Sequence, residues 1–309
     1  MESPISILKQ FVFLSLRRIA PEKGDNLSSV IEQQGITFRF VQDKDRIFFT
    51  ADSMNGVIAV GESCLERLWA MSYSYFLFYE AMCKAKDEDE SIKYIDIKSN
   101  LELENADKLL AWATSVDWQI KAEGKQRQAP LPEWPDSLPR PIENPQNASN
   151  EDIADKLFLS AVGFILHHEL AHIQLGHTKT TGVESILNEK YADRESAKWL
   201  LDGLQSTDKE FIQRIFGIAI ALLWTATLDA YVPSAGETHP PGYDRLYQTL
   251  SIFVDDDWHP VWEFVSIALG MHLRASRTHF DQEILHNSLK DAVNYYCDVL
   301  SKKFRETFS

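Results

Sequence analysis

The chain has 309 residues and a formal net charge of −15, from 46 acidic and 31 basic side chains. An acidic surface repels nucleic acid and anionic membranes, so we expect neither as a general partner. Hydrophobic residues make up 44% of the chain, which is ordinary for a soluble globular protein with a sizeable core. The three cysteines (Cys64, Cys83 and Cys297) are scattered and odd in number, which excludes a disulfide framework and favours a reducing cytoplasm.

The first third of the chain predicts a small β element followed by helices. Residues 1–18 carry their charges after the apolar run, which is the wrong order for a secretory signal. Within residues 35–60, short β-branched and aromatic runs are broken by Asp-Lys-Asp and Asn-Gly, so we expect two or three antiparallel strands. An aromatic-rich helix should follow from Gly61 to about Ala85, and another over 106–118.

Residues 124–150 contain six prolines and little periodicity, so they form neither a helix nor a central strand. One interpretation is an interdomain linker. The other, slightly favoured by its position just before the main motif, is a rigid loop across the active site. We therefore divide the chain into an N-terminal α+β region (1–123), this Pro-rich loop (124–150) and a helical region (151–309), with one continuous domain as the alternative.

The most informative motif lies in a long apolar helix predicted over 153–175. Its residues His168, Glu169 and His172 form an H-E-x-x-H pattern. Positions i and i+4 share one face of a helix, so both imidazoles can bind one metal ion while Glu169 reaches a metal-bound water. The flanks are apolar almost all round, which is typical of a buried helix, and buried polar groups need partners. This favours a metal site over polar residues on a solvated face.

A catalytic zinc usually has three protein ligands and one open position. The metzincin pattern would place Gly and His at positions that Leu175 and Thr178 occupy, so it is excluded. The other common solution uses a glutamate from a following helix, here predicted over 181–201. Glu189 is the candidate ligand, and Asp193, one turn later, can accept the second N–H of a ligating imidazole. The alternative is a solvated, charged helix that also carries Lys190, Arg194 and Glu195.

The rest of the chain predicts further helices. The longest apolar segment, 215–232, contains two threonines and an aspartate, so we expect a buried core helix rather than a membrane span. A turn-rich loop (233–243) and two or three amphipathic helices (244–304) follow. Of the other histidines, we expect His167 to pack or to support the site, and His177 to make a hydrogen bond at the helix end rather than to bind metal.

These motifs resemble those of the gluzincin metallopeptidases, whose third ligand is the glutamate of an N-E-x-x-x-D pattern like residues 188–193. Thr238-His239-Pro240, followed by Arg245 and Leu246, is similar to an element of the CAAX-protease and HtpX branch. The resemblance implies that His239 hydrogen-bonds the tetrahedral oxyanion and that Arg245 braces the ligand glutamate or the backbone. The alternative for His239 is an ordinary loop histidine before a proline turn.

The chain departs from the membrane members of that branch because it lacks paired membrane helices around the motif. Its length and the central position of the motif also resemble the Lit-type phage-exclusion peptidases, which cleave a host translation factor during phage infection. The specific resemblance covers about residues 160–250. It implies a protein or peptide substrate and regulated activity, with no activating partner identified.

Together these patterns predict a mostly α, α+β fold with a helical zincin-like core and a small antiparallel β element. We interpret the protein as a cytoplasmic zinc endopeptidase in which His168, His172 and Glu189 bind zinc and Glu169 is the general base. The alternative is a non-catalytic, zinc-stabilised regulatory or binding module. The presence of Glu169 speaks against that alternative, because a structural zinc site has no use for a base.

Overall fold

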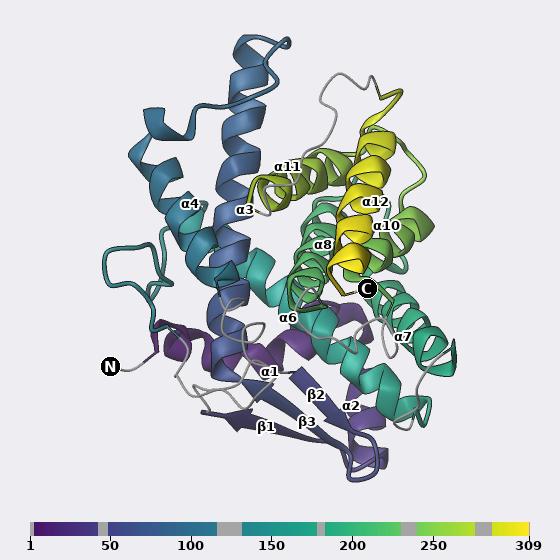
Figure 1. The fold of residues 1–309 in the computed structure, drawn as a ribbon. Coiled ribbons are helices and arrows are strands. Elements are labelled where there is room, and N and C mark those ends of the chain that lie inside the picture. Colours follow the sequence, from purple (N-terminus) through teal and green to yellow (C-terminus); the bar gives the residue numbers. More distant parts are fainter. Residues whose placement is uncertain are drawn as a thin grey trace.

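The computed structural model describes residues 3–42, 49–115, 132–177, 183–229, 240–275 and 286–308. Its secondary structure is mostly helical with one small sheet, which confirms the predicted mostly α, α+β class (Figure 1). The strands are β1 (Thr37–Val41), β2 (Phe49–Asp52) and β3 (Val57–Gly61). The longer helices are α1 (Lys9–Arg18), α2 (Gly24–Gln33), α3 (Glu62–Glu88), α4 (Leu101–Thr114), α6 (Asn150–Gln174), α7 (Val183–Leu201), α8 (Lys209–Asp229), α10 (Gly242–Phe253), α11 (Pro260–Ala275) and α12 (Leu289–Phe308).

The sheet has the strand order β1-β3-β2, and the prediction that it is antiparallel is only half right. β2 and β3 form the expected antiparallel pair, whose turn contains Gly56 at φ +63°. β1 and β2 also run in opposite directions, but β3 inserts between them and therefore pairs parallel with β1. β3 takes the centre because Ile58 and Val60 are fully buried there, whereas an edge position would leave an apolar strand unpaired on one side. The Asp-Lys-Asp turn lies outside the described residues.

Helix α6 is the central element of the fold. Ser149 caps the first turn of α6 by accepting a hydrogen bond from the backbone N–H of Asp152. The helix contacts α1, α3, α7, α8, β2 and β3. Helix α6 crosses α8 at Gly217, where an added Cβ would lie 2.3 Å from the Cβ of Ser160. Only glycine permits this approach. Figure 1 shows the sheet beneath α6, so that the C-terminal half of the helix lies between the sheet and α7.

The described part of the Pro-rich segment packs far from the H-E-x-x-H motif. Trp134 packs against Trp69 of α3 and Trp112 of α4, with ring centroids 5.7 and 4.9 Å apart. Trp69 in turn donates a hydrogen bond of 2.6 Å to Asp155 near the start of α6. At 1.5 Å per residue, Asp155 is about 20 Å from His168 along the helix. A loop across the active site is therefore wrong for residues 132–149, because the aromatic cluster holds them elsewhere; residues 124–131 lie outside the described part.

Helix α8 forms part of the common core. Within the described ranges, its segment Lys209–Leu228 is the one helix long and apolar enough to cross a membrane, and most of it is buried inside the protein. The core helix that we expected here is therefore observed. Buried apolar side chains from Ile5 to Leu300 belong to a single cluster, so the N-terminal and C-terminal regions share one core.

Candidate metal centre

Two consecutive helices bring three candidate ligands together. His168 and His172 lie on one face of α6, and Glu189 faces them from α7. The two Nε2 atoms are 3.1 Å apart, and each lies 3.3 Å from one carboxylate oxygen of Glu189. A tetrahedral zinc with bonds of about 2.0–2.1 Å has ligand atoms about 3.3–3.4 Å apart. These side chains therefore already lie close to the spacing that a tetrahedral ion requires.

Two further residues support this set from α7 and α10. Nδ1 of His168 lies 2.9 Å from Oδ1 of Asp193, so a proton on Nδ1 leaves Nε2 with a free lone pair. Arg245 donates two hydrogen bonds of 2.8 Å to Asp193 and places Nη1 3.3 Å from Glu189. In the neutral form of His168, which is the form that binds a metal, this lone pair faces the carboxylate of Glu189. Two acceptors that face one another are stabilised by a cation between them, so the donor set fits a metal ion.

The electrostatics of the cluster favour positive charge at the same place. Burial lowers the pKa of His168, but Asp193 and Glu189 more than offset it and raise that pKa to about 10. Burial disfavours the Glu189 carboxylate, yet Arg245 and the two imidazoles hold its pKa well below the ordinary range. The pKa of Asp193 is likewise lowered, because Arg245 and His168 outweigh burial. The carboxylates therefore stay ionised and are available to a cation.

Glu169 lies on α6 next to these ligands. Burial raises the pKa of its carboxyl group, although the neighbouring imidazoles and a hydrogen bond from the backbone of Ala51 in β2 act in the opposite direction. A carboxylate with a raised pKa is a better proton acceptor near neutral pH. The structure thus places a base next to the candidate metal ligands.

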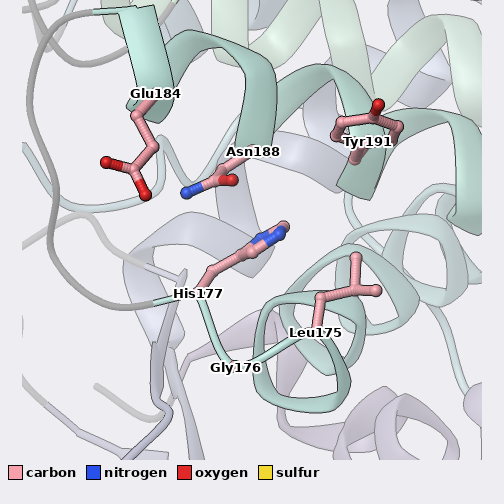
Figure 2. Close-up of a pocket in the computed structure, with 6 residues that line it drawn as sticks. All are labelled: Leu175, Gly176, His177, Glu184, Asn188 and Tyr191. Atoms are coloured by element: carbon pink, nitrogen blue, oxygen red, sulfur yellow. The ribbon is translucent and has the colours of Figure 1, made fainter.

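Beyond His172, the structure adds His177 to the cluster. Nδ1 of His172 lies 3.0 Å from Nδ1 of His177, just past the end of α6. His177 also lines a cavity of about 410 Å³ with Leu175, Gly176, Glu184, Asn188 and Tyr191. Figure 2 shows the ring of His177 between the end of α6 and the facing side of α7. Sequence reasoning predicted a hydrogen bond for His177 at the helix end, but it did not identify His172 as the partner.

The remaining predicted residues fall into two groups. Glu189 and Asp193 are only 7% and 1% exposed, so the solvated-helix alternative is wrong for these two. His167 points away from the centre, within 3.1 Å of the carbonyl oxygen of Leu16. Burial lowers its pKa to about 3, which keeps this imidazole neutral. His239 lies outside the described residues.

His168, His172 and Glu189 thus form a group that could hold a metal ion, with the carboxylate of Glu169 on the same helix as the two histidines. The family described as Peptidase U49 matches residues 58–265, about two thirds of the chain, and this segment contains every described residue of the cluster. The chain therefore belongs to the Peptidase U49 family and is a peptidase.

A curated relative agrees with this assignment. The chain is 29% identical over 259 residues to the cell death peptidase of Escherichia coli (strain K12), an alignment that covers 82% of this chain and 83% of the relative. The family and the relative confirm the resemblance to Lit-type peptidases that the sequence predicted. No solved structure matches the chain.

Proposed function

We propose that this peptidase is a zinc-dependent endopeptidase of the gluzincin type. The observation that carries the proposal is the convergence of His168, His172 and Glu189, whose ligand atoms all lie within 4.8 Å of one another, next to Glu169. The imidazole and carboxylate donors are those of catalytic zinc sites, and three such ligands leave one position open. When bound, zinc supplies a Lewis acid that activates water and polarises the peptide carbonyl.

In this proposal Glu169 carries the proton. Its carboxylate accepts a proton from the attacking water and then donates it to the nitrogen of the leaving amine. The raised pKa of Glu169 makes its carboxylate a stronger proton acceptor than that of an ordinary glutamate. Asp193 holds His168 in the tautomer that a ligand needs, and Arg245 keeps the carboxylates of Asp193 and Glu189 ionised.

The proposal retains His239 as a donor to the oxyanion. Arg245 belongs to the same sequence element and touches both Asp193 and Glu189, so the beginning of α10 lies close to the centre. This proximity supports a role near the reacting carbonyl for the residues just before α10, where a hydrogen-bond donor would stabilise developing negative charge.

We further propose a protein substrate, a cytoplasmic location and an activity that is restrained until a signal arrives, as in phage defence. Cys64, Cys83 and Cys297 are not joined by disulfide bonds, which supports a reducing compartment. The name of the relative, cell death peptidase, supports regulated cleavage, because an unrestrained activity of that kind would harm the cell that makes it. The competing function, a zinc-stabilised module without catalysis, leaves Glu169 without a role.

One experiment separates these functions. The purified chain is analysed for zinc by mass spectrometry and tested on a library of unstructured peptides before chelation, after chelation and after zinc is restored. We expect about one zinc per chain, together with cleavage that follows the zinc content. If the chain binds zinc but shows no cleavage that requires Glu169, the regulatory module is favoured. A chain that binds no zinc would overturn both proposals.

A further inference from the structure

We propose that His177 is a positioning residue that holds His172 in the tautomer and orientation required of a metal ligand. This inference rests on the proposed metal function and extends it to a residue outside the H-E-x-x-H motif. The side chains meet at their Nδ1 atoms, 3.0 Å apart, so Nε2 of His172 remains directed at His168 and Glu189.

The protons of the two rings follow from this geometry. A neutral imidazole carries one proton, and the nitrogen that binds a metal must offer a lone pair. Because Nε2 of His172 faces the other ligands, its proton belongs on Nδ1, which donates it to Nδ1 of His177. His177 is then an acceptor at Nδ1 and carries its own proton on Nε2. This hydrogen bond therefore selects the ligand form of His172.

The backbone at the end of α6 places His177 in this position. Gly176 has φ +65°, a left-handed conformation that ends the helix, and its N–H donates to the carbonyl oxygen of Ile173. The N–H of His177 donates to the carbonyl oxygen of His172 at 2.9 Å. These two bonds define a Schellman motif, in which the first residue after the glycine lies against the residue five positions earlier. An apolar contact usually occupies that place, whereas here it is a hydrogen bond between two histidines.

The turn after β2 fixes His177 from the other side. Oγ of Ser53 donates a hydrogen bond of 2.9 Å to the carbonyl oxygen of His177. The backbone of His177, from which the imidazole extends, is thus held by the cap of α6 and by the turn after β2. The two histidine ligands are oriented differently: Asp193 on α7 supports His168, and the cap of α6 itself supports His172.

Two substitutions of similar size test this role. In His177→Asn, the side-chain oxygen lies where Nδ1 was and can accept the same hydrogen bond. In His177→Leu, a methyl group takes that place and the acceptor is lost. Zinc affinity is measured for the full chain by competition with a chromophoric chelator, with helix content and zinc-free melting temperature recorded in parallel. His286→Leu, which removes a histidine packed on Tyr295 and Tyr296 in the C-terminal segment, serves as the control.

We expect His177→Leu to weaken zinc binding by about 10–100-fold, the effect typical of a lost partner of a ligating histidine. His177→Asn should keep most of the affinity, and His286→Leu should keep all of it. Equal affinity in the Leu and Asn variants, whether both match the wild type or both are weak, would overturn the role of the acceptor. A wild-type chain that binds no zinc would instead overturn the proposed function itself.

Discussion

The guanidinium of Arg245 binds the carboxylate of Asp193 through two hydrogen bonds of 2.8 Å, from Nε to Oδ2 and from Nη2 to Oδ1. Both side chains are buried, and the same guanidinium lies 3.3 Å from Glu189. One cation from α10 therefore balances two carboxylates of α7. This arrangement links the most distant element of the cluster to the helix that carries the third candidate ligand.

Replacing this cation should destabilise the zinc-free protein strongly. Arg245→Met keeps much of the side-chain volume but removes the guanidinium that pairs with the buried carboxylates of Asp193 and Glu189, which leaves His168 as their neighbouring cation and should cost about 3 kcal/mol. Urea unfolding in the presence of a chelator measures the loss, and zinc should reduce it by supplying another cation. Arg194→Met, on the exposed side of α7, should change stability by less than about 0.5 kcal/mol. Equal losses in both variants would refute the pairing.

Glu169→Gln should separate metal binding from catalysis. The amide has nearly the same shape but cannot accept a proton, so cleavage should fall by about 10²–10⁴-fold while zinc content stays at the wild-type level. Peptide cleavage and metal analysis of one preparation give both values. Glu210→Gln, at an exposed position of α8, should leave both unchanged. Cleavage at the wild-type rate in a clean Glu169→Gln preparation would exclude Glu169 as the base.

Glu189→Gln should lower zinc affinity itself. The substitution removes the charged oxygens that lie 3.3 Å from both imidazoles, so affinity should fall by more than about 100-fold, beyond the loss expected from a supporting residue. Equilibrium dialysis against buffered zinc measures it. Glu195→Gln, exposed on the same helix, is the matched control. If dialysis gave the same affinity for both variants, another side chain would have to be the third ligand.

The raised pKa of Asp155 predicts that the free energy of unfolding depends on pH whether or not a metal is bound. Burial raises its pKa from 3.8 to about 6, although the hydrogen bond from Trp69 acts in the opposite direction, and the nearby carboxylates of Asp152 and Glu151 raise it further. The folded protein therefore holds this proton more tightly than the unfolded chain. The resulting stabilisation is fully present below pH 3.8 and is lost as the pH rises through about 6.

Asp155→Asn removes this titration and can keep the hydrogen bond to Trp69 through its side-chain oxygen. The variant should exceed the wild type by on the order of 1–3 kcal/mol in unfolding free energy at pH 8, and the difference should vanish near pH 3.5. Thermal or urea unfolding across this range measures it.

Asp152, three residues earlier on α6, provides a control of opposite sign. Its carboxylate is stabilised by Lys156 and by the backbone N–H of Ala148, which lower its pKa in spite of burial. Asp152→Asn should therefore lose stability at neutral pH, and the loss should shrink as the pH falls through the lowered pKa. The absence of a gain in Asp155→Asn at pH 8 would show that the buried charge of Asp155 does not limit stability.

Local rules were sufficient to predict the helical part of the candidate site. The spacing of His168 and His172 places them on one face wherever residues 150–174 are helical, and the surrounding apolar residues show that this helix is buried. The glycines at 176 and 203 mark the ends of α6 and α7, where they adopt φ values of +65° and +86°. These features depend on residues within a few turns of one another, so the order of amino acids alone determined them.

Contacts between distant residues decided the rest. The choice of β3 as the central strand, the attachment of Trp134 to Trp69 and Trp112, and the approach of Arg245 to Asp193 each join segments that lie far apart in the chain. Which of several suitable partners a side chain meets depends on how the whole chain packs, and no spacing rule encodes that choice.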